Sequence, residues 1–432
     1  MYIRSIELTN FRCFEKERIE FDPQLTVLIG DNGCGKSSVL TALSIAAGSF
    51  FLGFDNIPSG SISQGDVRNK TYLSGSLVLR EPQFPAQISC TGSFDGATEL
   101  SWSRELNGEN RNTTLKNAGS IKSYANEIQE KIRQGNNEII LPIVSYYGTG
   151  RLYAQKKDSS LNDIEADGAV SRTLGYKDCL SAMSNEKLMI KWFRKMTYTE
   201  LQDGVEVPEL TTVKKAISLC MASVIPDCKQ DSVTVRYDVK SGELQLIYLD
   251  NNGAKNMQPM HELSDGYRNT LGMIADIAYR MAVLNPQMLD KCTETPGVVF
   301  IDEVDLHLHP QWQKKILGDL RAVFPNVQFI VTTHSPHVIA SVRGENIVIL
   351  EKYKVQNTTE NSYGKDANLI LNTFMGVSER PESVNKAIDR IYELIDDENY
   401  TEAGSATEKL AEILGEDDPV ITKLRTIISI EG

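Results

Sequence analysis

Alternating apolar and polar positions open the chain and predict two strands, at residues 2–8 and 16–21. An apolar run over 25–29 predicts a third, buried strand, and apolar residues at helical spacing over 39–45 predict a helix directly after it. Between about 70 and 105, short apolar segments are separated by turn residues, which predicts antiparallel strands. The first part of the chain is therefore expected to combine a buried strand and helix with an antiparallel sheet.

The rest of the chain alternates between helical periodicity and short buried runs. From about 165 to 224, apolar residues recur at helical spacing, which predicts an inserted helical subdomain. Another helix is predicted after Ser264, a suitable N-cap residue. The other predicted elements are a helix at 119–133, strands at 139–147, 231–238, 243–249, 297–303, 327–333 and 346–351, a helix from 310 to about 323, and helices over 364–430.

Residues 30–37, Gly-Asp-Asn-Gly-Cys-Gly-Lys-Ser, match the G-x-x-x-x-G-K-[ST] pattern of a P-loop between the third strand and its helix. Glycines let the backbone turn tightly and point N–H groups at phosphate, and the helix N-terminus adds positive partial charge. Lys36 is expected to reach the β- and γ-phosphates, and Ser37 to ligate Mg²⁺. The predicted nucleotide-binding residues here are Gly30, Asp31, Asn32, Gly33, Cys34, Gly35, Lys36, Ser37 and Ser38.

Polar residues follow two of the later buried strands. Asp302 and Glu303 end the apolar run at 297–303, and His334 follows the strand at 327–333. Ligands of α/β proteins bind at the carboxyl edge of the sheet, where these side chains are expected. Asp302 can then hold Mg²⁺, and Glu303 can orient or accept a proton from the attacking water. His334 can hydrogen-bond the γ-phosphate.

The composition limits where the protein acts and what it binds. The 432 residues suffice for one large domain with insertions or for two or three domains. No run of 18 apolar residues is present, and the seven cysteines form no C-x-x-C pair, so a cytoplasmic protein without membrane contact is expected. A net charge of −13 argues against nucleic-acid binding by the whole surface. A local basic groove for DNA or RNA, or a basic partner, remains open.

The order of these motifs resembles the ABC-type ATPase head of the SMC, RecF and OLD proteins: P-loop, Leu-Ser-Asp-Gly at 263–266, Asp-Glu, then histidine. The resemblance implies an α/β P-loop NTPase with a mixed sheet, an antiparallel β subdomain, an inserted helical subdomain and a helical C-terminal tail. The expected domains are an N-terminal ATPase lobe (1–150), a helical insertion (151–230), a C-terminal ATPase lobe (231–352) and a helical partner-docking region (353–432).

The resemblance also implies roles for residues outside the P-loop. Ser264 and Gly266 would belong to the signature motif, which contacts ATP across a head-to-tail dimer. The signature departs from Leu-Ser-Gly-Gly-Gln at two positions. Arg12 would contact nucleotide phosphate, Asp305 would be the D-loop acid, and Gln155 is the nearest candidate for the Q-loop residue that contacts the metal. The cofactors implied are ATP and Mg²⁺.

Within this group, residues 146–151, 302–310 and 333–336 resemble the OLD-like ATPases of anti-phage defence, such as the PtuA family of Septu systems, which also accompanies some retrons. This likeness implies a regulated or slow ATPase that controls a separate HNH nuclease of the PtuB type, since the chain has no H-N-H motif of its own. Two alternatives stay open: a RecF- or SMC-like DNA repair or recombination ATPase, and an ATP-sensing scaffold with little turnover.

Overall fold

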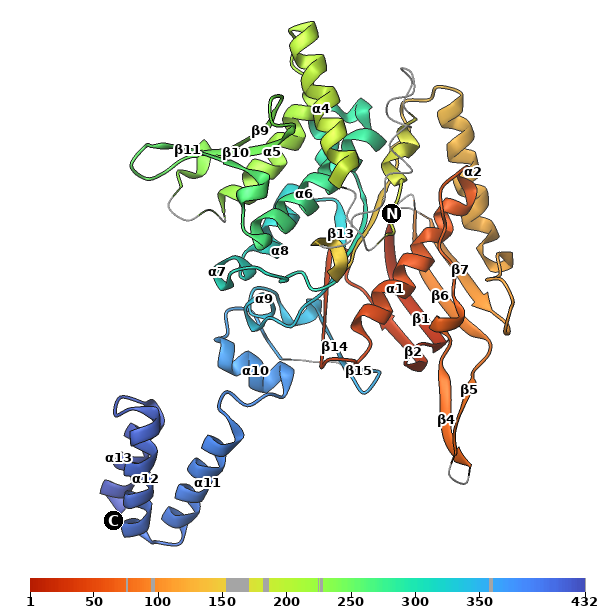
Figure 1. Ribbon diagram of the computed structural model, residues 1–432. Coiled ribbons are helices and arrows are strands. Elements are labelled where there is room, and N and C mark those ends of the chain that lie inside the picture. Colours follow the sequence, from red (N-terminus) through yellow and green to blue (C-terminus); the bar gives the residue numbers. More distant parts are fainter. Residues whose placement is uncertain are drawn as a thin grey trace. The chain divides into compact units, whose positions relative to one another are not determined.

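The structure, a computed structural model, describes residues 1–74, 77–94, 98–152, 171–181, 186–223, 225, 228–356 and 360–431 (Figure 1). The chain divides into two compact units, Met1–Lys365 and Asp366–Gly432. The P-loop, the two acids and His334 all belong to the first unit.

Among the described residues, a six-stranded mixed sheet in the order β15-β14-β3-β13-β12-β8 forms the centre of the first unit. Its strands are β3 (Leu25–Ile29), β8 (Ile143–Tyr147), β12 (Gly297–Ile301), β13 (Val327–Thr332), β14 (Ile347–Glu351) and β15 (Lys354–Gln356). Only β15 runs antiparallel to its neighbour. The register places Ile301 beside Val331, so the residues after β12 and β13 meet at one edge of the sheet.

A second, antiparallel sheet has the order β2-β1-β6-β7. It is built from β1 (Tyr2–Phe11), β2 (Phe14–Glu20), β6 (Ala86–Ser93) and β7 (Glu99–Leu106). The strands β4 (Asn69–Ser74) and β5 (Leu77–Pro82) pair only with each other among the described residues, in a hairpin that projects from the sheet (Figure 1).

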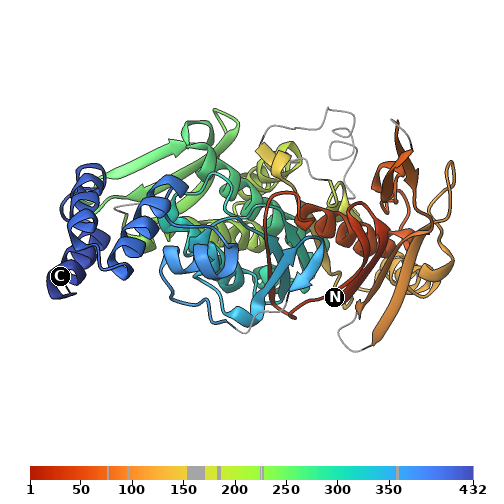
Figure 2. The same cartoon turned by 90° about the horizontal axis from the view of Figure 1, so that it is seen from below.

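The helix α1 (Lys36–Ala47) lies between the two sheets and packs against strands of both (Figures 1 and 2). Its burial explains its composition. The stretch Lys36–Gly53 is long and apolar enough to cross a membrane by length and composition, but 78% of it is buried, as in a core helix. The second sheet thus covers the helix that carries the P-loop.

The inserted helices and a small sheet form the other side of the first unit (Figure 1). The long helix α6 packs against α4, α5 and β8. Among the described residues, the α-helices of this unit beyond α1 are α2 (Gly119–Arg133), α4 (Glu186–Asp203), α5 (Pro208–Ala222), α6 (Asp265–Leu284), α7 (Pro310–Gln313), α8 (Ile316–Val323) and α9 (Pro336–Ile339). The small sheet has the order β11-β10-β9, from β9 (Thr234–Asp238), β10 (Glu243–Leu249) and β11 (Lys255–Pro259).

Most predicted elements are confirmed, but the short elements β15 and α9 were not predicted, and other regions differ as follows. The strand predicted at 139–147 begins only at Ile143, because the N–H and C=O of Leu141 bond to the side chain of Asn285 instead of a strand. The polar strand β11 was missed because it has no apolar alternation. The helix predicted from 310 breaks into α7 and α8.

The second unit is helical and has a core of its own. Its helices are α10 (Ala367–Met375), α11 (Glu382–Asp396), α12 (Tyr400–Leu414) and α13 (Pro419–Glu431). Ile391, Ala403, Ile421 and Leu424 are almost fully buried between α11, α12 and α13. The predicted α/β fold with a P-loop, a mixed sheet, antiparallel strands, inserted helices and a helical tail is confirmed.

Candidate functional site

A hollow of about 180 Å³ lies at the carboxyl edge of the central sheet. It brings together the P-loop, the two acids after β12 and the histidine after β13, which are far apart in the sequence. The residues that line it are Asn32, Gly33, Gly35, Lys36, Ser37, Ser38, Asp302, Glu303, Thr332 and His334. Nine of these ten are predicted site residues, and only Thr332 was missed.

The P-loop connects the buried strand β3 to α1, which begins at Lys36. Gly35 has φ +106°, and a Cβ atom there would lie 2.5 Å from the ring of Phe14. A side chain therefore cannot replace this glycine without moving the loop. The Nζ of Lys36 donates to the carbonyls of Gly30 and Asp31, at 2.7 and 2.9 Å. These contacts hold the lysine, which is 6% exposed, inside the loop.

The turn after β1 packs against the P-loop. Cys13 hydrogen-bonds Ser38, although burial raises the pKa of the thiol. Arg12 precedes this contact with φ 49°, and its Nε donates to Asp66 Oδ1 at 2.8 Å. Burial by itself would raise the pKa of Asp66, but hydrogen bonds from Ser63 and Arg12 outweigh it and lower that pKa. Arg12 is thus paired with a carboxylate beside the P-loop and is not among the residues that line the hollow.

The acids after β12 are held by the neighbouring strand. Asp302 is 5% exposed, and Glu303 has φ 48°, a left-handed conformation that is uncommon for residues other than glycine. Thr332 Oγ1 lies 2.7 Å from both Asp302 Oδ1 and the backbone nitrogen of Glu303. Asp305 accepts a hydrogen bond from Thr333 Oγ1 at 2.5 Å. Thr332 and Thr333 directly precede His334 in the sequence. This pair of hydroxyl side chains at the end of a buried strand could have predicted the contacts, but it was not used.

His334 faces the P-loop lysine across the hollow. Burial lowers the pKa of its imidazole, and the positive charge of Lys36 lowers it further, against the opposing effect of the nearby acids. The ring is therefore neutral at pH 7 and can donate one hydrogen bond and accept another.

The residues predicted to form the signature motif, Ser264 and Gly266, are not among those that line the hollow. Ser264 occupies the N-cap position of α6 as predicted, but its side chain makes no capping hydrogen bond. A Cβ atom on Gly266 would lie 2.2 Å from the carbonyl oxygen of His307, so the start of α6 packs directly on the loop after the two acids. Tyr267, one of the departures from the usual signature, packs its ring against Trp312 at 5.4 Å.

Two predicted metal ligands can be assessed. Ser37 and Asp302 both line the hollow, and a hydroxyl and a carboxylate are hard oxygen donors of the kind that Mg²⁺ takes together with substrate phosphates. The residues present therefore fit this ion. The third candidate, Gln155, lies outside the described residues.

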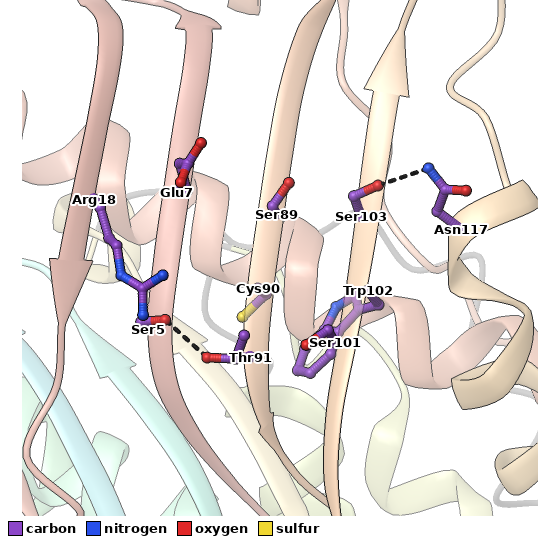
Figure 3. A pocket seen from close by; sticks show the side chains of 10 residues that line it. All are labelled: Ser5, Glu7, Arg18, Ser89, Cys90, Thr91, Ser101, Trp102, Ser103 and Asn117. Carbon is purple, nitrogen blue, oxygen red and sulfur yellow. Dashed lines mark hydrogen bonds between the residues drawn. The ribbon is translucent and has the colours of Figure 1, made fainter.

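Another hollow, of about 270 Å³, lies on the polar face of the antiparallel sheet. Figure 3 shows Glu7, Ser89 and Ser103 on neighbouring strands, and Asn117 donating to Ser103 at 3.0 Å. None of the predicted site residues lines this hollow. Alternation along the strands accounts for its polar lining, because every second residue faces away from α1.

The comparisons agree with this geometry. A family model described as an AAA domain matches residues 5–252, more than half of the chain. The chain is 26% identical over 419 residues to the Retron Vc95 probable ATPase of Vibrio cholerae, covering 88% of this chain and 80% of that protein. It is 23% identical over 446 residues to the Septu protein PtuA of Bacillus thuringiensis, covering 100% of this chain and 99% of that protein.

A solved structure of an SMC head bound to the C-terminal winged-helix domain of ScpA is also similar, with a TM-score of 0.46 and 17% identity over 84% of this chain and 98% of that one. One assignment agrees with the family match. It also agrees with the P-loop between β3 and α1 and with the acids at the edge of the mixed sheet. The chain belongs to the AAA domain family.

Proposed function

We propose that this chain binds and hydrolyses ATP as the dimeric switch of a prokaryotic anti-phage defence system of the Septu type. The single observation that carries the proposal is the hollow that joins the P-loop to Glu303 and His334. Lys36 binds the β- and γ-phosphates, Glu303 orients the attacking water, and the neutral His334 hydrogen-bonds the γ-phosphate.

Magnesium completes this site in the proposal. Ser37 and Asp302 hold the ion, which neutralises charge on the phosphates when it is bound. Lys36 and the backbone N–H groups of the P-loop stabilise the same charge from the protein side.

The active form is a head-to-tail dimer or a higher even oligomer. Ser264 and Gly266 do not line the hollow of their own chain, which supports their role in the site of a second copy. Each site would then be complete only when two chains enclose ATP. Hydrolysis by the monomer is expected to be slow, and ATP shifts the population toward the closed dimer by its higher affinity for that state. Arg12 and Asp305 are expected to approach the nucleotide on closure.

The defence role rests on the relatives, which include a retron ATPase and a Septu protein. The partner in the proposal is a separate nuclease of the HNH type. Any DNA or RNA is bound through a local basic groove, because the chain carries a net charge of −13. The complex would act in the cytoplasm.

The helical unit Asp366–Gly432 is proposed as the docking site for the nuclease. It contains a core of its own, and the most exposed of its described large apolar side chains are Ile413 at 75% and Ile430 at 78%. Ile413→Glu and Ile430→Glu in the full chain should abolish co-purification with the nuclease while ATP hydrolysis persists. Unchanged co-purification of both variants would contradict this docking site.

The central experiment measures ATP hydrolysis and native mass with ATP and Mg²⁺ for the wild type and for Glu303→Gln. Glu303→Gln should abolish hydrolysis and stabilise an even-numbered assembly, because ATP then persists between the chains. Glu294→Gln is the matched control, since Glu294 is exposed and precedes the opposite end of β12. Each chain is also co-expressed with the product of the neighbouring gene, to test whether that product is the proposed nuclease.

The outcomes separate the alternatives. ATP-dependent dimers that carry the nuclease support the defence switch. Dimers that ignore the nuclease and bind DNA ends would favour a RecF-like repair ATPase. Nucleotide binding without hydrolysis in every assembly would favour a sensing scaffold, and a monomer that ignores ATP would refute the switch.

A further inference from the structure

The end of strand β13 carries two buried threonines, Thr332 and Thr333, which are 0% and 1% exposed. The rest of β13 is buried, and valine, which has nearly the same shape as threonine, would suit such a strand. A buried hydroxyl costs free energy unless it is hydrogen-bonded. The positions of these hydroxyls therefore need an explanation beyond packing.

Both hydroxyls make the same pair of bonds. Thr332 Oγ1 accepts from the backbone N–H of Glu303 at 2.7 Å and donates to Asp302 Oδ1 at 2.7 Å. Thr333 Oγ1 accepts from the N–H of Ser335 at 3.0 Å and donates to Asp305 Oδ1 at 2.5 Å. Each hydroxyl oxygen thus links a loop N–H to a carboxylate: Thr332 donates its hydroxyl proton to Asp302, and Thr333 donates its own to Asp305.

Thr332 has the more direct relation to the reacting groups, because it also lines the hollow. Its bond to Asp302 fixes the orientation of that carboxylate. Its bond to the N–H of Glu303 holds a residue with φ 48°, and the carbonyl of Thr332 accepts from the N–H of Val304 at 2.9 Å. A left-handed non-glycine residue costs roughly 1–3 kcal/mol and persists only where its surroundings enforce it.

We propose that Thr332 is a positioning residue of the ATPase site, whose hydroxyl orients the Asp302 carboxylate toward Mg²⁺ and holds the backbone turn that directs Glu303 into the hollow. The inference rests on the proposed ATP hydrolysis. A positioning role differs from a purely structural role in what it predicts. If Thr332 positions the site, its hydroxyl, and not only the volume of its side chain, determines the rate of hydrolysis and the magnesium dependence.

Thr332→Val removes both hydroxyl bonds and keeps the shape, whereas Thr332→Ser keeps the hydroxyl. Thr26→Val is the control, because Thr26 is 1% exposed in the adjacent strand β3 and its hydroxyl accepts from Asp22 N at 2.9 Å, outside the hollow. For each full-length variant, the experiment measures kcat and KM for ATP, the thermal midpoint, and the Mg²⁺ concentration that half-saturates the fluorescence change of bound mant-ATP.

Thr332→Val should lower kcat by about 10- to 100-fold, as expected when reacting groups shift by up to an ångström, while KM changes by less than about threefold. The half-saturating Mg²⁺ concentration should rise severalfold. Thr332→Ser and Thr26→Val should stay within about threefold of the wild type in both measurements.

Wild-type kcat and magnesium dependence in Thr332→Val would overturn the inference. So would a Thr332→Ser variant as impaired as Thr332→Val, because the methyl group would then matter instead of the hydroxyl. A wild-type chain that hydrolyses no ATP would refute the proposed function, and the magnesium titration of mant-ATP binding would still decide the role of Thr332.

Discussion

The ion pair of Asp276 and Arg280 on α6 is buried in the core, where the two residues are 8% and 4% exposed. Arg280 Nε donates to Asp276 Oδ2 at 2.7 Å, and its Nη1 donates to the carbonyls of Gly175 and Lys177, both at 2.9 Å. Tyr147 donates to the same carboxylate oxygen at 2.8 Å. The pair therefore ties α6 to β8 and to residues 175–177, which lie within the predicted helical insertion.

The pair also reaches the acidic edge of the sheet, because the carbonyl of Tyr147 accepts from the N–H of Asp302 at 2.8 Å. Burial by itself would lower the pKa of Arg280, but the charges of Asp276, Tyr147 and Cys179 and the hydrogen bond to Asp276 together outweigh it and raise that pKa. The buried guanidinium of Arg280 therefore depends on the Asp276 carboxyl group for charge compensation.

We predict that Arg280→Met lowers the free energy of unfolding by about 3–5 kcal/mol, the usual cost of removing one partner of a buried ion pair. The reason is that the buried Asp276 carboxyl group loses its partner, and two carbonyls lose their donor. Asp276→Leu combined with Arg280→Met should cost less than Arg280→Met alone, because no charge is left unpaired. If the losses of contacts simply added, the double variant would be less stable than Arg280→Met, whereas we expect it to be more stable.

Urea unfolding followed by tryptophan fluorescence measures the effect, since Trp192 packs 5.5 Å from Tyr279 on α6. With a slope of about 3 kcal/mol per molar, the midpoint for Arg280→Met should fall by about 1 to 2 M. Arg133→Met is the control, because its pairs with Asp55 and Glu130 are on the surface and the midpoint should hardly change. A double variant no more stable than Arg280→Met would refute the reasoning.

Three further predictions test other contacts. Gln328→Leu should lower the free energy of unfolding by about 2–4 kcal/mol in urea titrations. The buried amide of Gln328 makes hydrogen bonds of 2.7–2.9 Å to three backbone groups near the ends of β1 and β2, and the substitution leaves those backbone groups unpaired. Gly266→Ala should reduce ATP hydrolysis at least tenfold, because the new Cβ atom would lie 2.2 Å from the carbonyl oxygen of His307. The control Gly272→Ala, on the same helix, places its Cβ atom no closer than 3.7 Å to a neighbouring atom and should retain activity. Equal rates of ATP hydrolysis in the two variants would contradict this prediction. Burial, and then the positive charge of Lys36, lower the pKa of His334 in the folded chain. The unfolded chain therefore binds a proton at this histidine more tightly than the folded chain does. As a result, the free energy of unfolding falls as the pH drops through about 6.5. His334→Gln should therefore lose less of its thermal midpoint than the wild type between pH 7.5 and 5.5, and an equal loss would exclude this contribution.

The sequence predicted the site well where function depends on local pattern. The P-loop needs a strand, glycines and a helix within a few residues, so its eight residues were readable without tertiary information. Asp302, Glu303 and His334 were predicted because each ends an apolar run, and ends of parallel strands share an edge. The ion pair of Arg12 with Asp66 was not predictable, because 54 residues separate the two side chains.

By itself, the sequence determined the class of the fold, the phosphate-binding loop and the acids that accompany it, because hydrophobic periodicity and glycine spacing are local properties. Only the tertiary structure decided which groups hold those acids in place. Thr332 contacts Asp302 because β12 and β13 are parallel neighbours in a fixed register, and that pairing joins residues 30 positions apart. Such contacts depend on strand order, which no local pattern in the chain encodes.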